Sequence, residues 1–481
     1  MKDESEYTGM TRRKFVSAVA AGTGFTVVPA HVLAGGGWKR PSQKLNIAGV
    51  GVGGMGAANL SRVESENIVA LCDVDEKYAA HVFKKYPGAR RWKDFRKMLE
   101  EQQEIDAVIV ATPTHLHAVV SKMAMEMGKH VYTQKPLTRT IEEGRVLLET
   151  ARRTGVATQM GNQGHSTGAV RTLREWIEDG AIGAVREVHC WAHAATGLWP
   201  TGIGRPRSTP PVPSHLDWDL WLGPAPSRPY HPVYHPWSWR GWWDFGNGAL
   251  ADMGSHAMDP PFYALQLGPP SSVSAAYSQL GGRDSKYSQA GFKFGRLFDL
   301  KMGVDGEEFP VQTSCSGPDA ETTPNSSVVR YKFSARGDMP PVTLTWWDSG
   351  LRPPVLAELG HPWRSNGNLF IGDKGSISCG THGGDMVIMP ENRRNEYQPP
   401  PKKYRRIKVV HEQDWIEACK GGRPACSNFE YAARLNEMIL LGALALRTGE
   451  RIEWDAEKMK ATNVSKAERY IRTSSRKGWR L

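Results

Sequence analysis

Lysine, aspartate and histidine at positions 135, 252 and 256 are the residue types that proton transfer requires. Asp252 and His256 are four residues apart in an apolar stretch, so both would lie on one face of a helix. A carboxylate beside an imidazole raises its basicity and fixes its orientation, as a general base requires. A helix-surface ion pair is the alternative. No third ligand is spaced nearby, so a metal site is not predicted.

Lys135 follows an apolar run, residues 130–133, that has the character of a buried strand, and Pro136 ends that strand. A lysine there can hold a reacting hydroxyl and stabilise developing negative charge. Taken alone, it would be a surface lysine before a turn. The preceding apolar run, 107–111, ends in Thr112-Pro113-Thr114-His115-Leu116-His117. Parallel sheets bind ligands at the carboxyl ends of their strands, so we expect both segments in one crevice.

A glycine-rich turn, Gly51-Val52-Gly53-Gly54-Met55-Gly56, follows the apolar run 45–50. A strand, a Gly-x-Gly-x-x-Gly turn and a helix form the pyrophosphate cradle of a dinucleotide-binding fold. Asp73 ends the next apolar run, 22 residues after Gly51, where the adenosine ribose needs an acceptor. This acid would repel a 2′-phosphate, so NAD is favoured over NADP. The alternative is a flexible glycine loop beside a surface acid.

The strand and helix pattern predicts two domains after residue 44. Residues 45–162 alternate strands with helices, which predicts a doubly wound parallel (Rossmann) sheet. Residues 163–455 predict an α+β domain with a large open, mostly antiparallel sheet, on which helices at 412–420 and 429–448 would pack. The expected strands of the two domains are 45–50, 68–72, 107–111, 130–133 and 157–160, then 185–192, 271–279, 327–334, 341–348, 367–371 and 375–379.

A long segment, 194–247, is rich in Pro, Trp, His and Gly, and eight of the 17 tryptophans lie between Trp191 and Trp243. Loops of this length are usually functional or disordered, and so many tryptophans argue against disorder. We expect at least half of the tryptophans to be structural. Others could stack on sugar faces. The candidate substrate contacts are His235, Trp239 and Arg240, together with Asn162 and His165 after the last strand of the parallel sheet. Gln163, between the last two, is a further candidate for lining the site.

Bulk composition is that of a globular protein, with 40% hydrophobic and 23% charged residues among 481. The net charge of +11 includes basic residues gathered at 402–408 and 469–480. Because no nucleic-acid motif accompanies them, we predict a solvated loop and a frayed basic tail, 456–481, and no nucleic-acid partner. The six cysteines show no short paired spacing, so no zinc ribbon or redox motif is predicted.

Residues 1–34 have the order of a signal peptide: Arg12-Arg13-Lys14-Phe15, a short apolar stretch and then small residues. The stretch is too short and too rich in glycine and alanine to be an ordinary membrane span. The paired arginines resemble the bacterial twin-arginine signal, although Val16-Ser17 replace the typical Leu-Lys. We therefore expect export of the folded protein, to the periplasm or beyond. A disordered basic start followed by a helix is the alternative.

Four ordered motifs make the chain resemble the Gfo/Idh/MocA oxidoreductases, the relatives of glucose–fructose oxidoreductase and inositol dehydrogenase. They are the glycine turn, Thr112-Pro113 with His117, Lys135-Pro136, and Asp252 with His256. The resemblance implies a homo-oligomer, a dimer or tetramer, that moves a hydride between a sugar or polyol carbon and NAD. It implies that His256 takes the hydroxyl proton, that Lys135 steadies the oxygen and that Asp252 orients the pair. The implied cofactor contacts are Gly51, Gly53, Gly54, Met55, Gly56, Asp73, Thr112, Thr114, His117, Gln134, Lys135 and Gln163.

Two departures from the family pattern fall near the expected nicotinamide: Gln134 replaces the usual Glu, and Thr114 replaces the frequent Asn. Some relatives in this superfamily oxidise a substrate transiently and return the hydride, as glycosidases or lyases. Export favours that alternative, because free NAD is scarce outside the cytoplasm. A silent-site sensor is disfavoured by the intact Lys135, Asp252 and His256.

Replacing Asp73 by alanine should weaken NAD binding, because the adenosine ribose would lose its carboxylate acceptor. Titration of the purified variant with NAD measures the effect. Unchanged affinity would contradict the placement of the ribose at Asp73.

Overall fold

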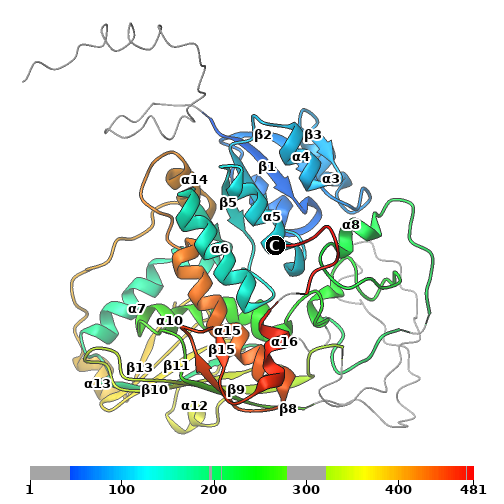
Figure 1. Cartoon of the computed structure of the whole chain (residues 1–481). Helices are drawn as coiled ribbons and strands as arrows, with labels where there is room; N and C mark the ends of the chain where they lie inside the picture. Colours follow the sequence, from blue (N-terminus) through cyan, green and yellow to red (C-terminus); the bar gives the residue numbers. More distant parts are fainter. Residues whose placement is uncertain (1–43, 194–197, 207, 279–320, 473) are drawn as a thin grey trace, which may run out of the picture. The chain divides into compact units, whose positions relative to one another are not determined.

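Six parallel strands form the first sheet, in the order β3-β2-β1-β4-β5-β6 that is typical of dinucleotide-binding folds (Figure 1). The computed structural model describes residues 44–193, 198–206, 208–278, 321–472 and 474–481, so the predicted signal segment lies outside the described residues. The strands are β1 (Asn46–Val50), β2 (Asn67–Cys72), β3 (Arg90–Trp92), β4 (Ala107–Val110), β5 (His130–Thr133) and β6 (Thr158–Met160). The predicted doubly wound parallel sheet is confirmed.

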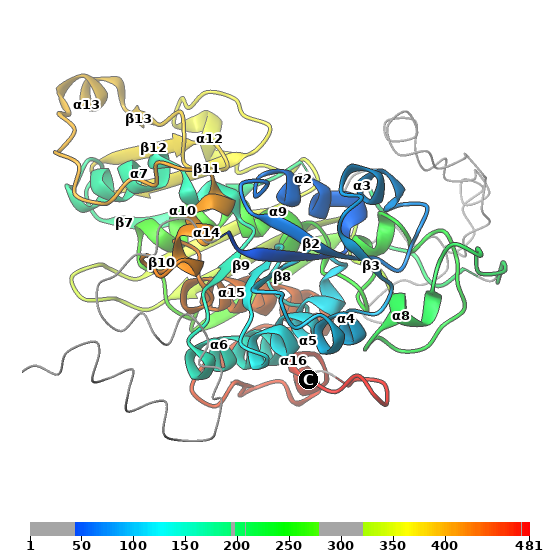
Figure 2. The same cartoon turned by 90° about the horizontal axis from the view of Figure 1, so that it is seen from above.

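Helices cover both faces of this sheet. Figure 2 shows α2 and α3 on one side of β1 to β3, and α4, α5 and α6 on the other. Two separate apolar clusters correspond to these faces, one holding Leu60 and Phe83, the other Leu99, Val120 and Leu147. The helical elements of this domain are the turn η2 (Val52–Gly56), α2 (Ala57–Ser61), α3 (Ala80–Lys85), α4 (Phe95–Glu101), α5 (Thr114–Glu126) and α6 (Ile141–Thr154).

The second sheet has nine strands in the order β13-β12-β11-β7-β10-β9-β8-β14-β15. Only the β7–β10 pair is parallel, so the predicted mostly antiparallel sheet is confirmed. The strands are β7 (Val185–Trp191), β8 (Ser272–Ser278), β9 (Ser326–Phe333), β10 (Val342–Trp347), β11 (Gly367–Gly372), β12 (Gly375–Cys379), β13 (Val387–Met389), β14 (Ile452–Asp455) and β15 (Lys460–Ala461). Its helical elements are η3 (Gln163–Ser166), α7 (Gly168–Glu178), α8 (Trp218–Leu222), η4 (Ser238–Gly241), α9 (Gly248–Ala257), α10 (Asp259–Ala264), α12 (Val355–Glu358), α13 (Glu391–Glu396), α14 (His411–Cys419), α15 (Phe429–Thr448), η6 (Ser465–Ala467) and α16 (Glu468–Ile471).

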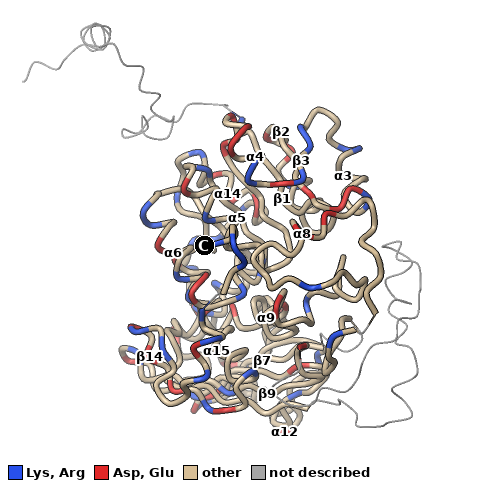
Figure 3. Tube along the Cα trace, turned by 45° about the vertical axis from the view of Figure 1, so that its right-hand side comes forward, with Lys and Arg blue, Asp and Glu red and all other residues tan. Residues whose placement is uncertain are grey.

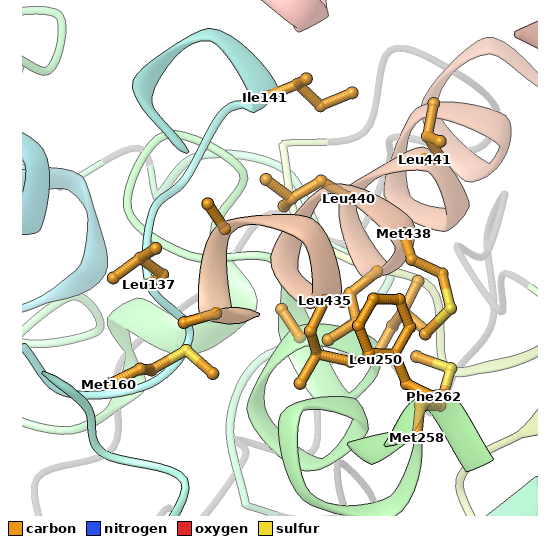
Figure 4. Packing of buried hydrophobic residues seen from close by; sticks show 14 of the residues in the cluster. Leu137, Ile141, Met160, Leu250, Met258, Phe262, Leu435, Met438, Leu440 and Leu441 are labelled. Atoms are coloured by element: carbon orange, nitrogen blue, oxygen red, sulfur yellow. The ribbon is translucent and has the colours of Figure 1, made fainter. Parts of the chain in front are cut away.

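Helix α15 joins the two domains. It begins at the cap Asn428 and ends at Gly449 in the left-handed conformation, and nearly all its residues are buried. Its side chains pack between Ile141 of α6 and Leu250 of α9 (Figure 4). The long buried helix therefore fixes α9, which carries Asp252 and His256, against the first domain.

The prediction that both late helices pack on the open sheet is wrong for α14. Trp415 and Ile416 of α14 belong to the apolar cluster of the first sheet, with Leu71 and Tyr132. The indole N–H of Trp415 also donates to the carbonyl of Ala157. Apolar periodicity predicted the helix correctly, but it does not indicate which sheet the helix covers.

The tryptophan-rich segment has its own apolar core. Trp218 and Trp221 stack with ring centroids 4.5 Å apart, and Tyr234, Trp242 and Phe245 pack around them. The prediction that at least half of the tryptophans are structural is confirmed, because seven of the eight are buried.

Basic and acidic residues are both scattered over the part of the chain that the structure describes (Figure 3). Arg406 of the predicted solvated loop pairs with buried Glu175, and Arg476 of the predicted frayed tail pairs with Asp219. Residues 456–472 form β15 and α16, and Trp479 is buried. The tail is therefore ordered where the structure describes it, because carboxylates and carbonyls distant in sequence bind its charges. None of the helices in the described ranges is long and apolar enough to cross a bilayer.

Buried neutral histidines should make the protein less stable as pH falls below about 6.5. Burial lowers the pKa of His115 to about 3, and the pKa values of His117 and His411 to about 4. The unfolded chain then binds more protons than the native one. Each such histidine lowers the free energy of unfolding by up to about 1.4 kcal/mol per pH unit between pH 6.5 and its folded pKa. Denaturant unfolding at pH 7 and pH 5 measures this loss.

In the variant His117→Gln, the free energy of unfolding should fall less steeply with decreasing pH, by up to about 1.4 kcal/mol per pH unit. The same replacement at exposed His81 should leave this pH dependence unchanged. Equal slopes in the wild type and H117Q would contradict the assignment.

Candidate active site

A hollow opens beside the glycine turn at the carboxyl ends of β1, β2, β4 and β5. It encloses about 1090 Å³, partly open to solvent, which is at the upper end of the range for ligand pockets. The first domain, the tryptophan-rich segment and Trp479 all contribute to its walls. The sequence-predicted site residues that line it are Gly51, Gly53, Gly54, Met55, Asp73, Thr112, Gln134, Lys135, His235, Trp239 and Arg240.

Close contacts explain the glycines of the turn. Gly51 has φ +77°, and a Cβ there would lie 2.7 Å from the backbone nitrogen of Thr112. A Cβ at Gly56 would lie 2.2 Å from the carbonyl oxygen of Gly51. At Gly53 a Cβ would lie 2.1 Å from Cδ1 of Tyr78, a residue that the sequence did not single out. Because Gly53 has no side chain, the ring of Tyr78 can pack directly against it. The Tyr78 ring also lines the hollow.

Asp73 braces the turn from the end of β2. Its Oδ2 accepts hydrogen bonds from the backbone nitrogens of Val52 at 2.8 Å and Gly53 at 3.1 Å. Its Oδ1 accepts from the backbone nitrogen of Asp75 at 3.0 Å. Burial raises the pKa of Asp73, and the bonds from Asp75 and Gly53 oppose that rise. The carboxylate lines the hollow where a ribose acceptor is predicted.

Gln134 is held by a chain of amide hydrogen bonds that ends at a carboxylate. Glu412 of α14 accepts from Asn59 Nδ2 at 2.7 Å, so the Oδ1 of Asn59 faces Gln134. Gln134 Nε2 donates to that oxygen at 2.9 Å. An ionised glutamate at position 134 could not donate this bond. The departure from the usual Glu therefore has a physical cause in Asn59 and Glu412.

Lys135 and Asp252 form the central ion pair of the site. Lys135 Nζ lies 2.8 Å from Asp252 Oδ1 and donates to the backbone carbonyl of Asp252 at 3.1 Å. Arg240 Nε lies 3.4 Å from the same Oδ1. Burial alone would raise the pKa of Asp252, but the charges of Lys135 and Arg240 outweigh it and lower the pKa to about 2. Asp252 is therefore an ionised anchor between two cations.

His256 lies one helical turn beyond Asp252 on α9. Burial and the nearby positive charge of Lys135 lower the pKa of His256 well below its usual range, so its imidazole is neutral. Its Nδ1 is buried and has no hydrogen-bond partner among the described residues. The ring of His382 lies edge-on at 5.3 Å, and the sequence did not single out this second imidazole. A neutral imidazole beside an ammonium can accept a proton from a hydroxyl that the ammonium holds.

Two predicted cofactor contacts lie behind the hollow. His117 is buried, with Nδ1 2.9 Å from the carbonyl oxygen of Pro136 and Nε2 2.9 Å from that of Thr112. Thr114 is fully buried at the start of α5. Neither lines the hollow. His117 braces the two loops that carry Thr112 and Lys135, and the direct cofactor contacts of Thr114 and His117 stay predictions.

Three predicted residues after β6 lie on the side of the site that faces α9. Asn162 accepts a hydrogen bond from Ser427 Oγ at 2.6 Å, and His165 Nδ1 lies 2.9 Å from Asp259 Oδ1. Both side chains are buried, and Gln163 lies between them in η3. None of the three lines the hollow, so their predicted contacts with cofactor or substrate remain untested.

The tryptophan-rich segment is pinned to the first domain through Asp75. His235 Nε2 lies 2.7 Å and His215 Nδ1 2.9 Å from the two carboxylate oxygens. Burial would raise the pKa of Asp75, but hydrogen bonds from His235 and from the backbone of Tyr78, with the charges of His235 and His215, outweigh it and lower the pKa to about 2. This bridge holds His235 and, beyond it, Trp239 and Arg240 over the hollow. Asp75 was missed because its partners lie at least 140 residues away.

Within the described ranges, no group of three or more His, Cys, Asp or Glu side chains could hold an ion.

The donors and shape of the hollow fit an NAD molecule. The glycine turn excludes side chains where phosphates must approach, and Asp73 supplies a carboxylate beside it. Apolar walls from Leu116, Trp221 and Trp239 suit flat rings.

Comparison with protein families matches both domains. Residues 45–162 match the family described as "Oxidoreductase family, NAD-binding Rossmann fold". Residues 167–278 match "Oxidoreductase family, C-terminal alpha/beta domain". The predicted Rossmann domain, with NAD as its type of cofactor, is thereby confirmed for residues 45–162.

Individual relatives are distant. The chain is 27% identical over 154 residues to levoglucosan dehydrogenase of Pseudarthrobacter phenanthrenivorans, covering 30% of this chain and 39% of that protein. It is 32% identical over 123 residues to Glycosyl hydrolase family 109 protein 2 of Shewanella, covering 24% and 27%. The chain thus spans well under two thirds of the curated relatives it matches. The WlbA dehydrogenase of Bordetella pertussis, solved with NADH and UDP-GlcNAcA, shares the fold with a TM-score of 0.56 at 16% identity, covering 86% of this chain and 99% of that one.

Replacing Gly53 by alanine should destabilise the protein through a clash with Tyr78 and should also weaken NAD binding. In the double variant Gly53→Ala/Tyr78→Ala, thermal stability should return to that of Tyr78→Ala alone, because the clash is gone. NAD affinity should stay low, because the added Cβ still meets the phosphates. Full recovery of NAD affinity in the double variant would show that Gly53 serves only the packing of Tyr78.

Proposed function

We propose that the chain is an NAD-dependent oxidoreductase of the Gfo/Idh/MocA type that acts on a sugar or polyol hydroxyl. The matches of residues 45–162 and 167–278 to the two domains of that family support the proposal. The observation that carries the proposal is the Lys135–Asp252 pair, 2.8 Å apart, at the edge of the dinucleotide hollow and one helical turn from neutral His256. The name of levoglucosan dehydrogenase supports a carbohydrate substrate.

The cofactor would be held by the glycine turn, Asp73, Thr112 and Lys135, which line one hollow. When bound there, its nicotinamide supplies the acceptor or donor of a hydride. An acid at Asp73 favours NAD over NADP, as predicted, because a 2′-phosphate would be repelled.

Proton transfer is assigned to residues of the chain itself. Lys135 donates a hydrogen bond to the substrate oxygen and stabilises the negative charge that develops on it. His256, held neutral by burial and by Lys135, takes the hydroxyl proton. Asp252 balances the charge of Lys135 and aims its ammonium group. In this geometry Asp252 orients Lys135 through a direct bond, while its effect on His256 is electrostatic.

Arg240 adds a second cation beside Asp252. Its guanidinium lies 3.8 Å from the ring of Trp237 and 4.3 Å from that of Trp239, so its direction is set by two indoles. All three residues line the hollow near Lys135. A sugar has both hydroxyl groups and apolar C–H faces. A guanidinium can donate hydrogen bonds to the hydroxyls, and an indole can pack against a C–H face. We therefore assign the substrate wall to these three residues.

A second candidate is an enzyme that oxidises its substrate transiently and returns the hydride, with no net redox change. The similarity to Glycosyl hydrolase family 109 protein 2 favours it. Export by the twin-arginine route, which we propose from Arg12 and Arg13, favours it as well, because an exported enzyme must regenerate its own cofactor. Both candidates use the same Lys135 and His256. We also propose that the protein works as a homo-oligomer.

The test is to purify the protein, determine whether NAD co-purifies, and supply a panel of sugars, polyols and aryl glycosides. Net NADH absorbance supports the dehydrogenase, and aglycone release without net NADH supports transient oxidation. Lys135→Met should lower turnover at least 100-fold in either case, because the oxygen loses its cation while the side chain keeps its length.

His256→Gln should lower turnover by a similar factor, since the base is lost. The matched control is Lys84→Met, on the exposed surface of α3, which should retain full turnover. Undiminished turnover in Lys135→Met would rule out the proposed chemistry, whichever product is seen.

A further inference from the structure

The segment 474–481 packs against the wall of the hollow. Trp479 is only 7% exposed, and its ring centroid lies 6.1 Å from that of Phe95. The guanidinium of Arg96 lies 4.2 Å from the indole. Trp479 and Phe95 line the same hollow as Asp73 and the glycine turn. In Figure 1 this red segment ends beside α5 and α8.

Arg476 fastens the segment to the end of α8. Its guanidinium donates to the carbonyl oxygens of Gly223 at 2.7 Å and Asp219 at 2.9 Å, and to Asp219 Oδ1 at 2.6 Å. Gly478 has φ +85°, a conformation that favours glycine, and it turns the chain so that Trp479 faces inward. The anchor and the turn together aim one indole at the hollow.

The position of Trp479 along the hollow identifies the part of a ligand it meets. Lys135 stands at the chemical end, and Asp73 beside the glycine turn marks the ribose and phosphates. In the strand order β3-β2-β1-β4-β5, Lys135 follows β5 and Asp73 follows β2. Phe95 follows β3, the next strand beyond β2, and Trp479 packs against Phe95, so both lie on the far side of Asp73 from Lys135. A dinucleotide with its nicotinamide at Lys135 would therefore carry its adenine to the Phe95 and Trp479 side.

We propose that Trp479 forms the wall against which the adenine of NAD stacks, so that the segment 474–481 is part of the cofactor site. This inference rests on the proposed NAD-dependent function. An indole face suits any base, because stacking needs a π-face and no hydrogen-bond pattern. The guanidinium of Arg476 is engaged by Asp219 and two carbonyl oxygens, so the contribution of Arg476 is to hold the segment rather than to bind a phosphate.

The experiment titrates purified protein with NAD, ADP-ribose and nicotinamide mononucleotide by calorimetry. In Trp479→Leu, which keeps apolar volume but removes the π-face, NAD and ADP-ribose should bind about tenfold more weakly. Nicotinamide mononucleotide should bind unchanged, because it has no adenine. Trp479→Phe should retain most of the affinity. Exposed Lys477→Leu, two residues away, is the matched control and should bind all three ligands like the wild type.

Wild-type affinity of Trp479→Leu for ADP-ribose would overturn the assignment of Trp479. An equal loss for nicotinamide mononucleotide would overturn it too, because that pattern reports a general disturbance of the fold. Failure of the wild type to bind either NAD or ADP-ribose would instead remove the proposed function. ADP-ribose binding needs no catalysis, so the two failures are distinguishable.

Discussion

The ion pair between Lys135 and Asp252 is the contact on which the arrangement of the site depends. Lys135 comes from the end of a strand in the first domain and Asp252 from a helix in the second, and both side chains are less than a fifth exposed. A charge left unpaired at that depth would be strongly destabilising. Arrangements of the two domains that would separate this pair are therefore disfavoured. Helix α15, packed against both α6 and α9, supplies the apolar contact area that holds the junction in that position.

A second charged contact extends this junction to the tryptophan-rich segment. Asp75 lies two residues after Asp73 and binds His215 and His235 of that segment. The apolar core around Trp218 and Trp221 gives the segment its own rigidity. Arg240, at the far end, returns to Asp252. The tryptophan-rich segment thus contacts both Asp75 and Asp252. The same segment therefore supports the cofactor wall and the proton-transfer site.

Local patterns in the sequence predicted most of the fold. Buried strands such as 107–111 and the helix face with Asp252 and His256 follow from apolar periodicity, which depends on near neighbours in the chain. Strand β3 was missed because two of its three residues are exposed, so no apolar pattern marks it. β13, β14 and β15 were missed as well, because at least half of the residues in each of these short strands are not buried.

The site was only partly predictable. The motif positions of Lys135 and Gly51 placed them correctly, because a strand end fixes where the next residue lies. His117 belongs to the same motif, yet its side chain turns back onto the carbonyls of Thr112 and Pro136. Motif order gives position in the chain and does not give side-chain direction. The role of Gln134 depends on Glu412, 278 residues away, and no local signal carries that information.

Different contacts hold the Lys135 side and the Trp479 side of the hollow. This difference matters for whether the enzyme keeps its NAD between turnovers. At the Lys135 side, three charges and α15 make a rigid wall. At the Trp479 side, Arg476 pairs with Asp219 and donates to two carbonyl oxygens, and the indole of Trp479 is buried. These contacts involve neither Lys135 nor Asp252, so the two sides are held separately. Retention of NAD at the Trp479 side would then depend on contacts with the cofactor itself, such as the indole. An enzyme that exchanges NADH each turn and one that returns the hydride in place can share this fold, and they would differ mainly in the strength of those contacts.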